Sequence, residues 1–275
     1  MGDSWNGQAG DTWTELANLL DQQLHALGRE AQIALDLQPG ERVLDVGCGG
    51  GETSLDLARA VTPGGSVVGV DISRTLLQRV AEPRVADMGL DIRFQVADAQ
   101  ISDFGGERFD AVFSRFGVMF FSDPAAAFAN ILKALKPGGR LGFVCWRSPE
   151  ENPHMTGASK AVEHLLPPMP SFDPLAPGPF SFADPERMRR ILDEAGYVAV
   201  AIRPYDALVG GLSLEDAMVM AERMGPLSAI LQANPDLRPQ IQDLVAASLR
   251  RQMSLDGRVK MSAAVWVVTA TVSSG

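Results

Sequence analysis

Three glycines at alternate positions, Gly47, Gly49 and Gly51, directly follow the short apolar run 42–46. Glycines in such a turn let the backbone bend sharply and approach a ligand without interference from a Cβ atom. A dinucleotide-binding turn would place its third glycine at position 52, but that residue is Glu52. A glutamate there would repel a pyrophosphate from the start of the following helix. The turn therefore favours another ligand, and a purely structural tight turn is the alternative.

Acidic residues lie close to the ends of the apolar runs, where a ligand could reach them. Asp71 closes the run 66–70, about twenty residues beyond the glycine turn. From that place a carboxylate accepts hydrogen bonds from both hydroxyls of a ribose, although a helix cap would use the same residue type. Asp98 follows the run 92–96, with a solvated turn as its alternative role. Asp45 is close enough to the turn for a ligand contact or for ordinary bonds to backbone amides.

Elements of alternating type must position these residues. Between most of these apolar runs lie segments in which apolar residues recur at helical spacing. Asp-Pro sequences mark where helices begin, and Pro-Gly-Gly sequences mark where they end. The expected strands are 42–46, 66–70, 92–96, 109–113, 140–146, 198–202 and 262–272. Such alternation predicts an α/β fold, a doubly wound and mostly parallel sheet covered on both faces. We expect the last strand to be antiparallel, at or near the sheet edge.

Three segments fall outside this alternation. Residues 1–39 form an N-terminal helical lid, because apolar residues recur at helical spacing over 12–35. Two inserts on the substrate side follow, a proline-rich one and a mainly helical one, at 148–183 and 207–260. The core then comprises 40–147, 184–206 and 261–275, and we expect the whole chain, 1–275, to be a single domain.

The three histidines are candidates for moving a proton. His154 lies in the proline-rich insert, where an imidazole could deprotonate a phenol or position a hydroxyl; an exposed loop histidine is the alternative. His164 has apolar neighbours and His25 lies on the N-terminal helix, so structural roles suit both better. Arg115, beside the fourth strand, could pair with a carboxylate. Neither a catalytic triad nor a metal-ligand cluster emerges, so we expect no metal.

Four stretches resemble motifs of the class I S-adenosylmethionine-dependent methyltransferases. They are Val-Leu-Asp-Val-Gly-Cys-Gly-Gly-Gly at 43–51, Val-Gly-Val-Asp at 68–71, Ala-Asp-Ala at 97–99 and Leu-Lys-Pro-Gly-Gly-Arg at 135–140. They occur in the order typical of the family. The stretches 113–121 and 5–13 are similar to small-molecule members near the ubiquinone and menaquinone methyltransferases.

The resemblance implies a Rossmann-like fold and S-adenosylmethionine as cofactor. Asp71 would then bind the ribose, Asp98 and the Ala99 backbone the adenine edge, and Ile72 the face of the ring, while Ser114 would border the methionine moiety. This ligand has no phosphate and carries a sulfonium and an ammonium, so acidic neighbours are compatible with it. The residues expected to bind the cofactor are Asp45, Gly47, Gly49, Gly51, Asp71, Ile72, Asp98, Ala99 and Ser114.

Composition restricts the partners. The 34 acidic residues exceed the 24 Lys and Arg, giving a formal charge of −10. That balance argues against nucleic acid as a partner and against an anionic membrane surface. The two cysteines have no metal-ligand spacing, the start carries no basic secretory signal, and no apolar run reaches a membrane-spanning length. We therefore expect a cytoplasmic protein.

These observations together predict methyl transfer from S-adenosylmethionine to an O, N or C nucleophile of a small, apolar or aromatic molecule. The alternatives are a protein that binds this cofactor without transfer and a nicotinamide-dependent oxidoreductase. Trp5 and Trp13 could cover the cofactor or merely anchor a helix. Met218, Met220 and Met224 could line an acceptor pocket, although methionines at helical spacing favour a place in the core.

Overall fold

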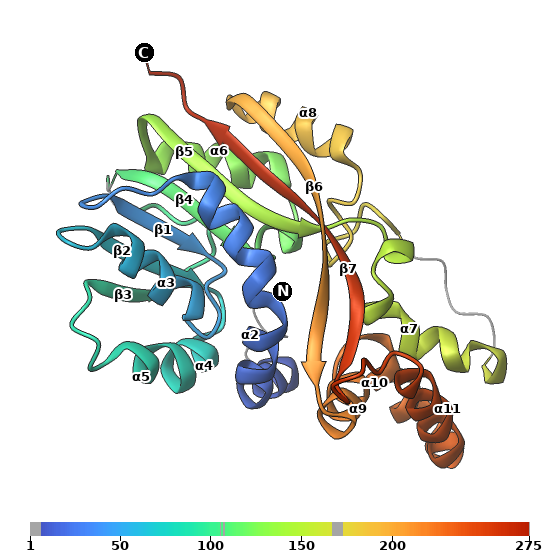
Figure 1. The fold of residues 1–275 in the computed structure, drawn as a ribbon. Coiled ribbons are helices and arrows are strands. Elements are labelled where there is room, and N and C mark those ends of the chain that lie inside the picture. Colours follow the sequence, from blue (N-terminus) through green and yellow to red (C-terminus); the bar gives the residue numbers. More distant parts are fainter. Residues whose placement is uncertain (1–6, 105, 107, 167–172, 275) are drawn as a thin grey trace.

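The sheet has seven strands in the order β3-β2-β1-β4-β5-β7-β6 (Figure 1). This computed structural model describes residues 7–104, 106, 108–166 and 173–274. The strands β1 to β5 run parallel, and β7 is antiparallel to both β5 and β6. The prediction of a mostly parallel sheet with an antiparallel strand near its edge is confirmed. The strands are β1 (Arg42–Val46), β2 (Ser66–Asp71), β3 (Ile92–Val96), β4 (Phe109–Arg115), β5 (Leu135–Trp146), β6 (Val198–Leu212) and β7 (Val259–Thr271).

Helices cover both faces of this sheet: α2 and α3 lie on one face, α6 and α8 on the other (Figure 1). The helices are α2 (Gln8–Leu35), α3 (Glu52–Val61), α4 (Arg74–Leu76), α5 (Glu82–Val85), α6 (Pro124–Ala134), α7 (Pro153–Val162), α8 (Pro185–Ala195), α9 (Leu214–Arg223), α10 (Gly225–Ala233) and α11 (Arg238–Arg250). Short turns of other helix types are η1 (Leu77–Ala81), η2 (Val118–Phe120), η3 (Pro149–Glu151), η4 (Glu163–Leu165) and η5 (Pro235–Leu237). Among the described residues, no helix has the length and apolar character to cross a membrane.

The Asp-Pro sequences begin helices for a local reason. The Asp123 carboxylate accepts a hydrogen bond from the Ala126 N–H at 3.0 Å, at the start of α6. Asp184 does the same for the Glu186 N–H at 2.9 Å, at the start of α8. Each aspartate satisfies a backbone donor that has no partner inside the helix, and the proline that follows needs none. Both starts are therefore predictable from two adjacent residues.

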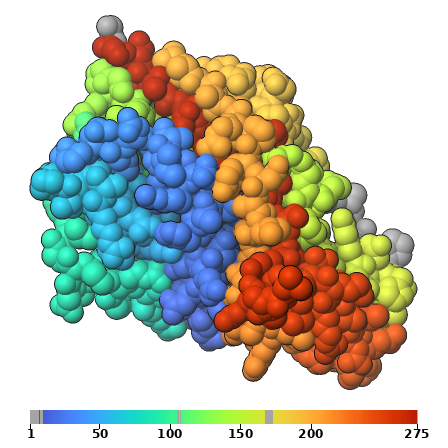
Figure 2. Space-filling view, in the orientation of Figure 1, coloured from blue at the N-terminus to red at the C-terminus, as the bar shows by residue number. Residues whose placement is uncertain are grey.

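The buried apolar residues form two large clusters. The first surrounds the sheet and includes Leu44, Phe113 and Phe143. The second joins α2 to α7, α9, α10 and α11, and includes Leu16 and Ile241. β6 and β7 run on past the first cluster as a two-stranded extension that carries the second (Figure 1). In Figure 2, α2 (blue) lies between the core and this extension (orange and red).

The structure defines the content and the limits of the two inserts. The first insert, which the sequence marks as proline-rich, contains α7 and two short turns, η3 and η4. Its prolines do not prevent this, because Pro149 and Pro153 each occupy the first turn of a helical element. β6 continues ten residues beyond its expected end at 202, so the second insert begins later than predicted.

Candidate cofactor and acceptor site

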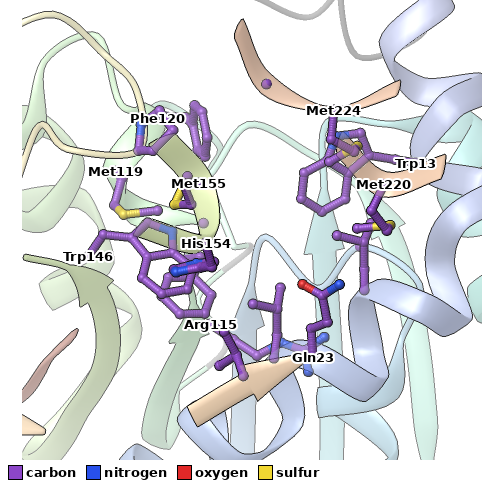
Figure 3. A pocket seen from close by; sticks show the side chains of 18 of the residues that line it. Trp13, Gln23, Arg115, Met119, Phe120, Trp146, His154, Met155, Met220 and Met224 are labelled. Atoms are coloured by element: carbon purple, nitrogen blue, oxygen red, sulfur yellow. The ribbon is translucent and has the colours of Figure 1, made fainter. Parts of the chain in front are cut away.

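A cavity of about 910 Å³ lies at the carboxyl ends of the parallel strands. This is the edge of an open α/β sheet where ligands bind, and the volume lies at the upper end of the ~300–1,000 Å³ range of small-molecule sites. Residues of α2, α7 and α9 line other parts of it (Figure 3), together with residues of η2, α10, α11, β6 and β7. The strand ends contribute residues 46–50, 70–72, 97–100, 115–117 and Trp146.

The glycine turn after β1 is closely packed on one side and open on the other. Gly47 has φ +69, and a Cβ atom there would lie 2.8 Å from the Cα of Gly117. A side chain at this position would therefore force the β1 and β4 loops apart. Gly49 has φ +51, and nothing lies within 4 Å of the place of its Cβ. The backbone at Gly49 is therefore open to the cavity, and a bound molecule can approach it directly.

The Asp71 carboxylate fixes this turn and can still accept a hydrogen bond from a ligand. It accepts hydrogen bonds from the Gly49 N–H at 2.9 Å and the Ser73 N–H at 2.8 Å. Burial raises the pKa of Asp71, and the bonds from backbone N–H groups oppose that rise. The Ile72 N–H acts on the same carboxylate. A carboxylate offers about four acceptor directions, so at least one is left for a ligand. Asp71 lines the cavity, where a ligand hydroxyl could use it.

The loop after β3 forms the neighbouring part of the wall. Asp98 is exposed and lines the cavity, and its Oδ1 accepts a hydrogen bond from the Gln100 N–H at 2.9 Å. The Ala99 carbonyl accepts one from the Asn130 amide at 3.0 Å, which fixes the loop from behind. Ile72 also lines the cavity. A carboxylate, a backbone segment and an apolar side chain are thus brought together with Asp71, as predicted.

Asp45, although predicted to contact the ligand, lies behind the wall. It is fully buried, and its Oδ2 accepts hydrogen bonds from the hydroxyls of Thr53 at 2.6 Å and Ser54 at 2.7 Å. Burial raises the pKa of Asp45 to about 6. Its Oδ1 has no partner among the described residues. The contacts make Asp45 an anchor for the first turn of α3, because that turn supplies both hydroxyls.

Gly51 and Ser114 are also absent from the cavity wall. A Cβ at Gly51 would lie 2.9 Å from the Phe94 ring, which packs behind the turn. The buried Ser114 hydroxyl donates to the Val46 carbonyl at 2.8 Å and accepts from the Gly117 N–H at 3.2 Å. These bonds hold the β1 and β4 loops against each other. Both residues therefore shape the site from behind.

A network of charges fastens α2 over the cavity, and it includes the carboxylate pairing that the sequence allowed for Arg115. The buried guanidinium of Arg115 pairs with Asp21 of α2 at 2.7 Å and with Glu52, the first residue of α3. Asp21 also pairs with Arg84 of α5 at 2.6 Å. The two carboxylates raise the pKa of Arg115 by more than burial lowers it, so the guanidinium stays charged. His25 Nδ1 lies 3.2 Å from Glu52, which gives His25 a place in the same network.

His154 stands on α7 at the far side of the cavity, beside Trp146 (Figure 3). Its Nδ1 lies 3.2 Å from the Ser262 carbonyl, which can only accept, so Nδ1 carries the proton. Its Nε2 is buried without a partner among the described residues. Burial lowers the pKa of His154 to about 4, so the imidazole is neutral at pH 7. Trp146 in turn stacks on Phe116 with ring centroids 4.1 Å apart.

The opposite wall is apolar. Trp13 of α2 lies beside Met220 and Met224 (Figure 3). Met220 and Met224 belong to the second apolar cluster and also line the cavity. They therefore have both a place in the core and a place in the pocket wall, the two alternatives that the sequence left open. Met218 packs in the same cluster without lining the cavity. Trp5 lies outside the described residues.

Several residues of the cavity wall were not among those predicted from the sequence. Trp146 could have been found, because it ends β5 at the edge where ligands bind. Phe116 could have been found as well, because it directly follows β4 at the same edge. Gln23 is different, because it reaches the cavity only once α2 packs against the sheet. His164 is exposed on η4 and does not line the cavity. Among the described residues, no three His, Cys, Asp or Glu side chains are arranged to hold a metal ion.

Comparison with known proteins identifies the family. Residues 43–139 match the family model described as a methyltransferase domain. The ubiquinone/menaquinone biosynthesis C-methyltransferase of Stutzerimonas stutzeri is 30% identical over 207 residues, which cover 71% of this chain and 79% of that protein. The chain belongs to the class I S-adenosylmethionine-dependent methyltransferases. An uncharacterised protein of Mycobacterium tuberculosis is 36% identical over 132 residues, and this methyltransferase chain spans 47% of its length.

Solved structures share the fold of this methyltransferase. The YcgJ protein of Bacillus subtilis superposes with a TM-score of 0.60 at 17% identity, covering 91% of this chain and 99% of that one. The cyclase SpnF superposes with a TM-score of 0.56 at 21% identity, covering 98% and 97%. At such low identities the likeness concerns the fold alone, which is the Rossmann-like one that the sequence predicted.

The residues of the site fit S-adenosylmethionine, the cofactor of this methyltransferase family. The open face at Gly49 allows close approach, and the Asp71 carboxylate has acceptor capacity left for a ribose hydroxyl. Glu52 would oppose a pyrophosphate at the start of α3, but S-adenosylmethionine has none. The nearest cation, Arg115, is already shared by two carboxylates, which also disfavours a phosphate ligand.

Proposed function

We propose that this methyltransferase moves the methyl group of S-adenosylmethionine to an O, N or C nucleophile of a small, apolar or aromatic molecule. The observation that carries this proposal is the continuity of one cavity. Asp71 and the glycine turn line the same cavity as His154 and the apolar residues of α7 and α9. A cofactor and an acceptor can therefore meet inside it, as a displacement at carbon requires.

The positions of the wall residues support the cofactor contacts that the family resemblance implies. Asp71 would accept from the ribose hydroxyls, Asp98 and the Ala99 backbone would meet the adenine edge, and Ile72 would pack on the ring. The backbone from Gly47 to Gly49 would approach the methionine part of the molecule. Asp45, Gly51 and Ser114 act through the turn, because they hold it in place from behind.

The protein contributes alignment and exclusion of water. When bound, S-adenosylmethionine supplies an electrophilic methyl group on a sulfonium, so the leaving group needs no further activation. The lid of the single domain is α2, fastened by Arg115, and the two inserts provide the acceptor wall. His154 is the candidate to receive a proton when the nucleophile carries one, and its buried Nε2 must first become accessible from the cavity to do so.

The activities for which two relatives are named support an apolar aromatic acceptor. The Stutzerimonas stutzeri relative is a ubiquinone/menaquinone biosynthesis C-methyltransferase. A relative from Staphylococcus saprophyticus, 26% identical over 213 residues and matched over 74% of this chain and 90% of its own, is a demethylmenaquinone methyltransferase. The Trp, Phe and Met side chains of the cavity suit a ligand of that general kind.

A second candidate function is binding of the cofactor without transfer. The cyclase SpnF has the same fold, so the fold by itself allows other chemistry. A broad acceptor panel with tritiated S-adenosylmethionine separates the two: methyl transfer to any acceptor supports the proposal, and tight cofactor binding without transfer supports the second candidate.

Calorimetric titration tests the cofactor first. S-adenosylmethionine and S-adenosylhomocysteine are expected to bind at one site per chain, while NAD and NADH are expected not to bind. Binding of NADH without binding of S-adenosylhomocysteine would contradict the proposal and favour a nicotinamide-dependent oxidoreductase.

A further inference from the structure

Residues 253–258 form a hydrogen-bonded turn, the tip, between α11 and β7. The Gly257 N–H donates to the Ser254 carbonyl at 2.9 Å, and the Ser254 N–H donates to the Arg258 carbonyl at 2.9 Å. Leu255 occupies a central position of this turn, where glycine, proline, asparagine, aspartate and serine are the usual residues. Its exposed fraction is 110%, so no described residue covers it. The tip thus presents an apolar side chain directly to solvent.

A second apolar side chain and a cluster of cations flank Leu255 along the chain. Met253 is 41% exposed. Residues 250–260 contain four basic side chains, Arg250, Arg251, Arg258 and Lys260, against one acidic side chain, Asp256. Asp256 pairs with Lys260 at 2.7 Å, whereas the exposed Arg250 and Arg251 have no ion pair with any described residue. These arginines are therefore available to an external anion.

The local charge of this region is opposite to that of the whole chain. The formal charge of −10 counts against attraction to an anionic surface at a distance. At physiological ionic strength, however, salt screens charges that are more than about 8 Å apart. On contact, the residues at the surface decide, and each Lys or Arg strengthens binding to anionic lipid about fivefold. Glu215 and Glu222 line a groove with Arg250 and offset part of this effect.

The tip is also joined to the wall of the large cavity. It lies where β6 ends and β7 begins, at the end of the two-stranded extension farthest from the core (Figure 1). Gln252 and Val259, the residues on either side of the tip, both line the cavity. The Lys260 N–H donates to the Gln252 carbonyl at 3.1 Å, which closes the base of the turn. A surface that binds the tip therefore comes close to the cavity wall.

We propose that the tip docks this protein on an anionic lipid bilayer, with Leu255 and Met253 entering the headgroup region and the flanking cations contacting lipid phosphates. A protein partner would need a pocket shaped for Leu255, whereas a bilayer accepts a protruding apolar side chain anywhere on its surface. Binding is weak and reversible, on the order of 10³–10⁴ M⁻¹ in lipid, as for a single acyl chain. An apolar acceptor, as proposed above, concentrates in lipid, so docking brings the cavity to its source.

Cosedimentation with lipid vesicles tests the docking. Vesicles of equal parts phosphatidylcholine and phosphatidylglycerol should bind the protein at least about tenfold more tightly than vesicles of phosphatidylcholine alone. Raising the salt concentration from about 0.1 M to about 1 M should remove this difference, because the screening length falls from about 10 Å to about 3 Å. No binding to the mixed vesicles, or equal binding to both kinds, overturns the proposal.

Variants with matched controls test the residues of this region. Leu255→Ser should weaken binding to the mixed vesicles about tenfold, and Arg250→Gln combined with Arg251→Gln about twentyfold. The controls are Leu175→Ser and Arg190→Gln, which change the same residue types at exposed positions elsewhere. They should change binding by less than about twofold. Unchanged binding by the variants of this region, with S-adenosylhomocysteine binding retained as evidence of folding, overturns the proposal.

A fluorescent label tests insertion directly. The two native cysteines, Cys48 and Cys145, are buried, so Leu255→Cys provides one exposed thiol for a polarity-sensitive dye. The emission of the dye should shift to shorter wavelength when the mixed vesicles are added, because its surroundings become apolar. The same dye on Leu175→Cys should keep the emission typical of water. Unchanged emission at position 255 overturns insertion of the tip.

Vesicle binding and cofactor binding are separate measurements, so the two proposals can fail independently. If S-adenosylhomocysteine binds and the mixed vesicles do not sediment the protein, the docking is wrong while methyl transfer stands. If the vesicles sediment the protein and S-adenosylhomocysteine does not bind, the docking stands and the proposed function fails.

Discussion

Replacing Asp71 by alanine removes the carboxylate on which the cofactor part of the cavity depends. In the wild-type protein its two oxygens accept from the Gly49 N–H at 2.9 Å and the Ser73 N–H at 2.8 Å. The Ile72 N–H also acts on this carboxylate, so at least one acceptor direction is left for the ribose. Hydrogen bonds to a charged group contribute about 1.5–3 kcal/mol each. Losing one or two of them corresponds to about 1.5–6 kcal/mol, or about tenfold to ten-thousandfold in the dissociation constant of S-adenosylhomocysteine.

The same substitution has a smaller effect on stability. It leaves two backbone N–H groups without their carboxylate partner, at a cost of about 1–3 kcal/mol each when such donors are buried. It also removes the cost of burying the carboxylate, whose raised pKa shows that the charged form is disfavoured there. We therefore expect Asp71→Ala to fold, with a free energy of unfolding lower by about 1–3 kcal/mol.

Titration calorimetry with S-adenosylhomocysteine and urea denaturation measure the two quantities separately. Asp71→Asn keeps one acceptor oxygen, so its dissociation constant should lie between those of the wild type and Asp71→Ala. Asp91→Ala is the matched control, because Asp91 is exposed and precedes β3 at the opposite edge of the sheet. A folded Asp71→Ala protein that binds S-adenosylhomocysteine within about twofold of the control would refute the ribose assignment.

Three further substitutions test the parts that surround this site. Gly47→Ala should lower both stability and S-adenosylhomocysteine affinity, because its Cβ meets backbone at 2.8 Å; Gly257→Ala has a similar φ of +75 in open space, so it should lose only about 1–2 kcal/mol of stability. Arg115→Met should cost about 1–3 kcal/mol of unfolding free energy in urea, because two partly buried carboxylates lose a charged hydrogen-bond partner, whereas Arg203→Met, from an exposed pair, should cost under about 1 kcal/mol; equal losses would contradict the network. Because the pKa of His154 is lowered from 6.5 to about 4, protonation favours the unfolded chain, so stability falls progressively as the pH drops from about 6.5 to about 4. The stability of wild type relative to His154→Phe should thus fall by about 2 kcal/mol from pH 7 to pH 5, and a constant difference would show that the imidazole is not buried.

The cofactor half of the site could be predicted because its signals are local. The glycine turn needs a left-handed backbone at Gly47 and Gly49, and no other residue type adopts it so readily. Asp71 ends a strand and is followed by a capped helix start at Ser73. The Asp-Pro pairs determine two helix starts through bonds to residues two or three positions away. Each of these features depends on a few neighbouring residues.

The acceptor half could be predicted only in part, because it depends on contacts between distant segments. Asp21 and Arg115 are 94 positions apart, and neither residue type signals a partner. His154 was a candidate from its place in an insert, but its unpartnered Nε2 depends on burial by α7 packing against β7. The direction in which Met220 faces was open, because a helix periodicity does not distinguish a core from a cavity wall.

A crystal structure with S-adenosylhomocysteine bound tests the central claim, that one cavity holds both the cofactor and the acceptor. The account predicts the ribose hydroxyls on the Asp71 carboxylate, the adenine beside Asp98, and the sulfur directed towards the part of the cavity that His154 and Trp146 line. A cofactor bound elsewhere, or one whose sulfur points away from His154, would contradict it.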